Sequence, residues 1–152
     1  MDFKLQGVVV PVITPFDDAG EFDDSAMGQL VDYLIARGIH GLFPCGTTGE
    51  GFLLSLDERR RVAEAVIEAA DGRIPVIVHT GAANTTDAIA LTEHAKAAGA
   101  DAIAVIPPFV YHHTDGALMR HYMAVVNSAP DLPLLLYNFP AISNNALTFD
   151  LI

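Results

Sequence analysis

Five short apolar runs, rich in Val, Ile and Leu, recur along the chain. Near-continuous runs of this kind are typical of strands that are buried on both faces of a parallel sheet. They recur at intervals of about 30 residues, which is the length of a strand plus its return helix. We therefore expect five strands, at residues 7–13, 39–45, 74–78, 102–106 and 132–137.

The segments between these runs carry apolar residues at helical spacing. They predict helices at residues 23–37, 57–70, 84–98 and 114–128, and a glycine follows each of the first three closely. Ser55 and Glu58 form an S-x-x-E capping box at the start of the second helix, and Asn84 can cap the third. Strand–helix alternation predicts a parallel sheet with right-handed crossovers.

Two α/β architectures have this alternation, the doubly wound sheet and the (β/α)8 TIM barrel. The sequence has no G-x-G-x-x-G after the first strand and no Gly-Lys-Ser/Thr anywhere, which favours the barrel. It holds four complete βα units, a fifth strand, and residues 148–152, which look like the start of a fifth helix. Because a barrel needs eight units and about 250 residues, we expect residues 1–152 to be the N-terminal part of a single barrel domain, truncated in the fifth unit.

Composition narrows the functional classes. Hydrophobic residues make up 51% of the chain and charged residues 18%, as in a globular protein. The formal net charge of −11 argues against a nucleic-acid partner, which requires a basic face. No apolar run reaches the roughly 18 residues of a membrane span, and the N-terminus lacks the pattern of a secretion signal. Cys45 is the single cysteine, so a reducing cytoplasm is the simplest location.

Polar side chains follow the apolar runs, where open sheets and barrels bind ligands. Gly46-Thr47-Thr48-Gly49-Glu50 offers two hydroxyls and several backbone amides to a small anion. The alternative is that Thr47 and Thr48 are turn residues that satisfy their own backbone. Tyr137, at the end of the fifth run, is either a tyrosine packed over the core or a phenol placed to exchange a proton with Thr47.

Other polar residues have simpler interpretations. His79 lies at a strand end and can be structural, a minor substrate contact or a metal ligand. His112, His113 and Asp115 are interpreted as a solvated loop, and Arg59-Arg60-Arg61 as a solvated helix face. We expect Cys45 to be a small buried residue.

Three motifs together resemble one known family. Residues 7–16 (GVVVPVITPF), 46–50 (GTTGE) and 137–140 (YNFP) are similar to the dihydrodipicolinate synthase/N-acetylneuraminate lyase family, and the resemblance covers essentially the whole chain. It implies a (β/α)8 barrel, usually a homotetramer, that joins pyruvate to an aldehyde or reverses that reaction as a class I aldolase. It implies no metal and no organic cofactor, because a lysine on the sixth strand forms a Schiff base with pyruvate.

The resemblance also implies roles for individual residues. Thr48, with the amides near Gly46, would hold the pyruvate carboxylate. Thr47 and Tyr137 would form a proton relay, with Tyr137 as acid/base beside the imine. The Schiff-base lysine would lie beyond residue 152, since Lys4 precedes the first strand and Lys96 lies on an outer helix. The chain as given should therefore not perform Schiff-base chemistry.

Two positions depart from the synthase pattern. Ile142 stands where the synthases carry an arginine for the carboxylate of the amino-aldehyde. The run 140–143 is closer to the sialic-acid lyase and sugar-acid aldolase branches, and Asn144 stands where the family usually has glycine. The synthases also send a second tyrosine into a neighbour's site. Val110 aligns with it, and Tyr111 can substitute if the loop shifts, or lie exposed at a subunit contact.

Three functional hypotheses follow. The first is a carbon–carbon lyase or synthase whose partners are pyruvate, or another 2-keto acid, and an aldehyde. This hypothesis expects a cytoplasmic homotetramer for the full-length parent, with no nucleic-acid or membrane partner. The second is a metal-dependent aldolase on a similar barrel, with His79 among its ligands. The third is a non-catalytic half-barrel that acts in assembly or regulation.

Overall fold

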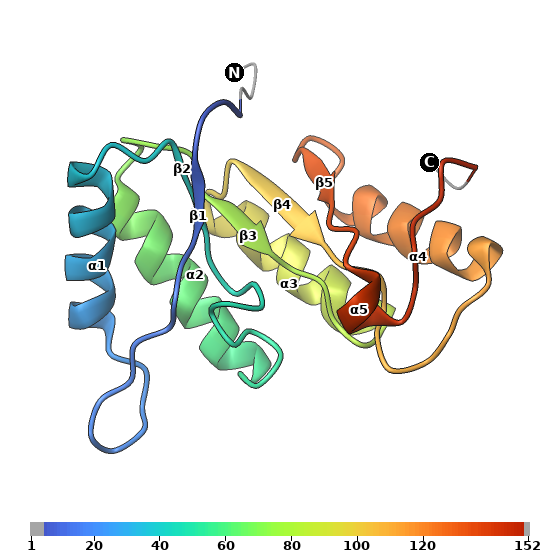
Figure 1. Cartoon of the computed structure of the whole chain (residues 1–152), viewed down its shortest axis with the longest axis horizontal. Coiled ribbons are helices and arrows are strands. Elements are labelled where there is room, and N and C mark those ends of the chain that lie inside the picture. Colours follow the sequence, from blue (N-terminus) through green and yellow to red (C-terminus); the bar gives the residue numbers. More distant parts are fainter. Residues whose placement is uncertain (1–4, 151–152) are drawn as a thin grey trace.

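Strands and helices alternate along the chain in a computed structural model, which describes residues 5–150 (Figure 1). The strands are β1 (Val9–Pro11), β2 (Gly41–Phe43), β3 (Ile77–His79), β4 (Ala102–Val105) and β5 (Leu134–Leu136). The helices are α1 (Asp24–Ala36), α2 (Leu56–Ala70), α3 (Thr85–Ala98), α4 (Asp115–Ser128) and the short α5 (Pro140–Ser143). The four long helices begin and end within one residue of the predicted ranges.

The strands lie in sequence order and every pair is parallel. β1 pairs with β2, β3 with β4 and β4 with β5. A bridge between Leu42 and Val76 joins the two groups, supported by the Leu42 N–H donating to the Pro75 carbonyl at 3.0 Å. The long helices follow one another along one side of this curved sheet, each packed on the next (Figure 1). All five strands therefore end at the same edge of the sheet, which we call the rim.

Two predictions of element bounds are wrong in detail. The strands have three or four paired residues instead of five to seven, because the ends of each run turn away from pairing; Gly7, for example, has a φ of +92°. No helix forms at Thr148, Phe149 or Asp150, while residues 151 and 152 lie outside the described residues. Instead α5 follows β5 almost directly, with proline in its first turn and Asn144 ending it in the left-handed region.

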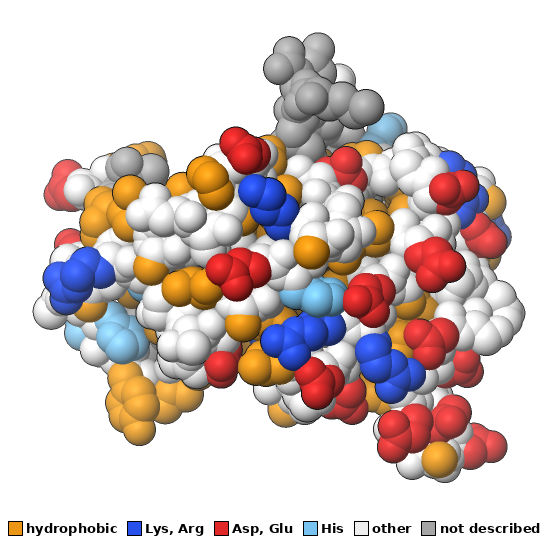
Figure 2. Space-filling model, turned by 180° about the vertical axis from the view of Figure 1, so that it is seen from behind, with side chains coloured by type: hydrophobic (Ala, Val, Ile, Leu, Met, Phe, Trp, Pro, Cys, Tyr) orange, Lys and Arg blue, Asp and Glu red, His pale blue; other side chains and the backbone are white. Residues whose placement is uncertain are grey.

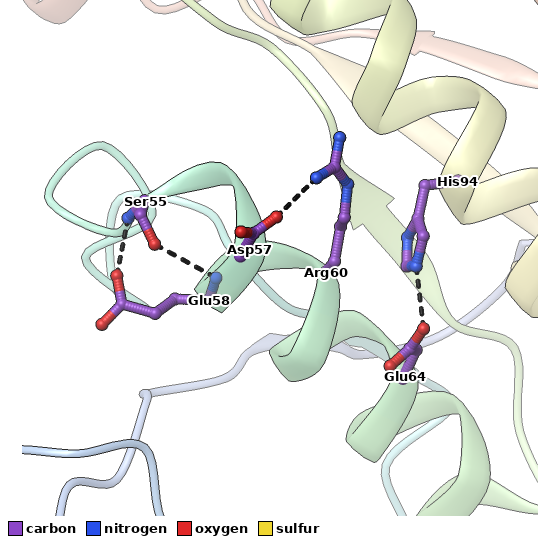
Figure 3. A network of polar contacts seen from close by, with 6 residues as sticks. All are labelled: Ser55, Asp57, Glu58, Arg60, Glu64 and His94. Carbon is purple, nitrogen blue, oxygen red and sulfur yellow. Dashed lines mark hydrogen bonds and ion pairs between the residues drawn. The ribbon is translucent and has the colours of Figure 1, made fainter.

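The predicted capping box at the start of α2 is confirmed. Ser55 Oγ accepts from the Glu58 N–H at 3.2 Å, and the Glu58 carboxylate accepts from the Ser55 N–H at 2.7 Å (Figure 3). Hydrogen bonding of the Glu58 carboxylate to the side chain and backbone N–H of Ser55 lowers the pKa of Glu58. Further along α2, Glu64 pairs with His94 of α3 at 2.8 Å and so links neighbouring helices (Figure 3).

The main apolar core lies between the sheet and the long helices. Its fully buried members come from all of these layers: Met27, Val31, Leu42, Val62, Val66, Ile103, Val105, Leu118 and Val125. Among residues 5–150, none of the helices has the length and apolar character that a membrane crossing requires. Burial of this core fixes the strands and leaves the rim loops to present polar side chains.

Acidic side chains, interspersed with Lys and Arg, are spread over the helix-covered face of the molecule (Figure 2). A groove of about 620 Å³ runs between α1 and α2, and its acidic lining comes from Asp24, Asp32, Glu64 and Glu68. It lies among the outer helices, so it is separate from the rim where the predicted site residues lie.

Candidate functional site at the strand ends

The loop after β2 is tightly folded. The Glu50 N–H donates to the Thr47 carbonyl, and the Gly51 N–H donates to the Gly46 carbonyl, both at 3.1 Å. A side chain at Gly51 is excluded by packing, since its Cβ would lie 1.9 Å from the Cys45 carbonyl oxygen. The hydroxyl of Thr14, which follows β1, donates to the Gly49 carbonyl at 2.7 Å. Contacts from the segment after β1 and within the loop after β2 thus fix the backbone of this loop.

This fixed loop brings a threonine hydroxyl to the predicted phenol. Thr47 Oγ1 lies 3.4 Å from Tyr137 Oη, although the two residues are 90 positions apart in the sequence. The Tyr137 N–H donates to the Val105 carbonyl at 3.0 Å, which places Tyr137 directly beyond β5. Its ring makes an edge-to-face contact with Phe43 of β2, with centroids 5.7 Å apart. The two hydroxyls can therefore exchange a proton without a large movement.

The same loop offers backbone donors. Thr47 and Thr48 are exposed, whereas Gly46 is buried. Within residues 5–150, the N–H groups of Thr47 and Thr48 donate to no other protein atom. Two neighbouring amides beside a hydroxyl can donate together to a small carboxylate. The interpretation that these threonines only satisfy their own backbone does not account for the free amides.

His79 is buried directly below the rim. Its Nδ1 lies 3.1 Å from the Cys45 carbonyl oxygen, to which it donates in the Nδ1–H tautomer, and 3.4 Å from a guanidinium nitrogen of Arg59. Burial, together with the nearby Arg59 cation, lowers the pKa of His79 from 6.5 to about 3, so the ring is neutral at physiological pH. Phe43, Phe52 and Tyr137 surround it at edge-to-face distances of 5.5 to 5.9 Å.

The surroundings of His79 differ from those expected of a metal ligand. His79 is 1% exposed and its neighbours are aromatic rings and backbone carbonyls. Across residues 5–150, no three His, Cys, Asp or Glu side chains come together as a metal site would require. The pair His112 and His113 lies in a loop, with His112 exposed and His113 partly exposed.

Arg59 corrects one sequence interpretation. We expected a solvated arginine, but the side chain is 4% exposed and donates to the carbonyls of His79 at 2.7 Å and Gly81 at 3.0 Å. Arg60 and Arg61 do reach acidic partners on the surface. A signal for Arg59 was present, since it lies three and seven positions before the buried residues of α2, Val62 and Val66.

The burial expected for Cys45 is confirmed, at 1% exposure. Burial raises the pKa of its thiol to about 11, so the sulfur stays protonated at neutral pH. Its Sγ donates to the Arg59 carbonyl at 3.6 Å. This contact ties the end of β2 to α2 below the rim loop.

Among the described residues, the side chains of the other candidate positions make no hydrogen bond to the hydroxyl pair. Tyr111, in the loop after β4, is 74% exposed, and within the described residues the hydrogen bond recorded for it is made by its backbone carbonyl to Asn145. Ile142 of α5 is 41% exposed. Lys96 lies on α3, with its Nζ 3.5 Å from an Asp131 oxygen, and Lys4 lies outside the described residues.

Comparison with known proteins decides the family. The model of the dihydrodipicolinate synthetase family matches residues 4–152. The chain belongs to this family. The resemblance found in the three sequence motifs is thereby confirmed, as is the α/β class with the (β/α)8 TIM-barrel fold, of which the chain forms about half.

Two functional branches of the dihydrodipicolinate synthetase family occur among the relatives. The chain is 47% identical to a 4-hydroxy-tetrahydrodipicolinate synthase of Syntrophobacter fumaroxidans over 90% of this chain and 46% of the relative. It is 41% identical to an N-acetylneuraminate lyase of Salmonella paratyphi B over 96% of this chain and 49% of the relative. The chain thus spans about half the length of the curated relatives it matches.

Solved structures of this family have the same fold. The dihydrodipicolinate synthase from Aquifex aeolicus matches with a TM-score of 0.93 and 37% identity, over 97% of this chain and 50% of that one. A prophage protein of Escherichia coli K12, solved in complex with pyruvate, matches with a TM-score of 0.91 and 39% identity, over 95% of this chain and 48% of that one.

Proposed function

We propose that this chain forms the N-terminal half of a single (β/α)8 domain in a longer protein. That protein is a carbon–carbon lyase or synthase, which joins pyruvate to an aldehyde through a Schiff base or cleaves the product. The family membership and the half-length coverage of the relatives support this proposal. The amine that forms the imine would come from a residue beyond this chain.

The observation that carries the proposal is the 3.4 Å contact between the hydroxyls of Thr47 and Tyr137. An imine withdraws electrons, so the methyl carbon of bound pyruvate can lose a proton and become a nucleophile. A phenol next to a second hydroxyl can move protons to and from such intermediates. Thr48, with the amides near Gly46, would hold the carboxylate of the keto acid.

The chemical class of the aldehyde is inferred from one side chain of α5. Ile142 is partly exposed on this helix, at the position where a cation would bind a second carboxylate. An apolar side chain there favours an uncharged, hydroxyl-bearing aldehyde, as in the sialic-acid lyase and sugar-acid aldolase branches. Overall sequence identity does not distinguish a synthase from a lyase, because relatives of both kinds match closely. A cytoplasmic homotetramer completes the proposal: the family resemblance supports the tetramer, and the single cysteine supports the location.

The experiment is reductive trapping. A longer chain that carries these residues is treated with borohydride and pyruvate, and the protein mass is measured. We expect a reduced pyruvate adduct on a single lysine, with activity that survives a chelator. Treatment without pyruvate, and the 152-residue chain with pyruvate, are the controls and should give no adduct. An absent adduct combined with loss of activity in chelator would replace the proposal with the metal-dependent alternative.

A further inference from the structure

One buried asparagine links the two loops that follow β4 and β5. The Asn145 side chain is 2% exposed. Its Nδ2 lies 2.9 Å from the Pro108 carbonyl, 2.8 Å from the Tyr111 carbonyl and 2.9 Å from the Ser143 carbonyl. Its Oδ1 accepts from the His113 N–H at 2.7 Å.

These contacts satisfy both polar atoms of the amide. Nδ2 has two hydrogens for three carbonyls, so one hydrogen is shared, and Oδ1 can only accept. A buried amide with every group satisfied holds its neighbours firmly, whereas losing one partner leaves a costly unpaired group. The partners from the β4 loop, Pro108, Tyr111 and His113, lie on both sides of Val110.

Val110 shows why this loop needs to be held. Its φ is +80°, in the left-handed region that β-branched residues rarely adopt. A strained conformation persists only where the surrounding structure over-determines it. Val110 is 67% exposed, so packing around its own side chain does not supply that constraint. The hydrogen bonds that Asn145 makes to the backbone on either side of Val110 supply it.

We propose that Asn145 is a positioning residue that sets the turn at Val110 and thereby places Tyr111 for contact with the second substrate, the aldehyde. The inference rests on the proposed function. Asn145 makes no hydrogen bond to Thr47 or Tyr137. The loop after β2, which would bind pyruvate, is held separately by Thr14 and by its own hydrogen bonds. Its effect should therefore fall on aldehyde binding and leave the pyruvate step unchanged.

The first test uses the 152-residue chain. Amide hydrogen exchange is measured by mass spectrometry for wild type and for Asn145→Asp, which keeps the acceptor for His113 but removes both donors. Asn84→Ala is the matched control, because it removes a helix-capping asparagine outside this loop. We expect exchange in residues 107–115 to rise at least about tenfold in Asn145→Asp only, as for a lost hydrogen bond. Unchanged exchange there, or an equal rise throughout the chain, would overturn the inference.

The second test uses the longer enzyme. In Asn145→Asp, the KM for the aldehyde should rise about tenfold while the rate of pyruvate trapping stays within about twofold. Tyr111→Ala should give the same split, and the double variant should be no worse than either single one. Equal losses for both substrates would show a general structural role and refute the inference. If wild type traps no pyruvate, the proposed function fails, while the exchange experiment still tests the hold on the loop.

Discussion

Arg59 of α2 donates a hydrogen bond of 2.7 Å to the main-chain carbonyl of His79, at the end of β3. A second bond reaches the Gly81 carbonyl at 3.0 Å, and within residues 5–150 no carboxylate lies within ion-pair distance of this buried cation. Backbone carbonyls are therefore the main hydrogen-bond acceptors for this charge. The helix layer is thereby fixed to the strand end that supports the rim.

Replacing this arginine should be costly. We expect Arg59→Met to lower the free energy of unfolding by about 2–4 kcal/mol, because two buried carbonyls lose their charged donor. Arg60→Met is the matched control on the same helix. It removes an exposed ion pair with Asp57 and should change stability by less than about 0.5 kcal/mol. Urea denaturation of both variants measures the difference, and equal effects would contradict the structural role assigned to Arg59.

Acid should destabilise the protein through His79. Its pKa is about 3 in the folded state and 6.5 ordinarily, so the unfolded chain binds more protons between these values. Stability is thus full above pH 6.5 and falls as the pH drops toward 3. Between pH 7 and pH 4 the loss from this group is roughly 3 kcal/mol.

The measurement is urea denaturation at pH 7, 5.5 and 4 for wild type and His79→Gln. The variant lacks the titrating ring, so its stability should depend on pH less steeply than that of wild type. Parallel curves for the two proteins would show that His79 does not carry this acid sensitivity.

The two adjacent threonines should have separable effects on catalysis by the longer enzyme. Thr47→Val and Tyr137→Phe remove the proton path and should each lower kcat by roughly 100-fold. Thr48→Val removes a carboxylate donor and should raise the KM for pyruvate by about tenfold with a smaller change in kcat. Steady-state kinetics with varied pyruvate distinguishes the two patterns. The assignment fails if Thr47→Val changes only KM.

Two glycines should respond to alanine in opposite ways. Gly28 lies inside α1, and apart from the adjoining helix backbone no atom lies within 4 Å of the place that an added methyl group would take, so Gly28→Ala should stabilise by about 0.5–1 kcal/mol. Gly51→Ala places a methyl group against the Cys45 carbonyl and should destabilise by about 1–3 kcal/mol. Thermal unfolding of both variants gives the signs, and a stabilising Gly51→Ala would mean that the rim loop is less tightly packed than described.

Much of the fold could be predicted because the signals are local and periodic. Apolar runs and helical spacing indicated the element order, and the Ser55–Glu58 pair indicated the start of α2. The meeting of Thr47 and Tyr137 was also accessible, since the ends of parallel strands lie at one edge. The exact strand lengths could not be predicted, because the pairing of a residue depends on the neighbouring strands and not only on the composition of its own run.

The buried polar residues were harder to predict. The charge of Arg59 indicates an exposed side chain, whereas its spacing from Val62 and Val66 places it on the buried face of α2. Asn145 gave no local signal at all, since its partners Pro108 and Tyr111 lie 37 and 34 residues away in the sequence. Its role emerges only when the two loops come together.

The Thr47–Tyr137 contact also makes the chemistry depend on strand alignment. The two residues follow β2 and β5, with β3 and β4 between them. A slip of two residues at any of these strand pairs would carry the phenol roughly 7 Å along the strand axis, beyond reach of the threonine. Misaligned copies of the protein would consequently be inert rather than miscatalytic, because the proposed proton path requires a sheet that has assembled correctly throughout.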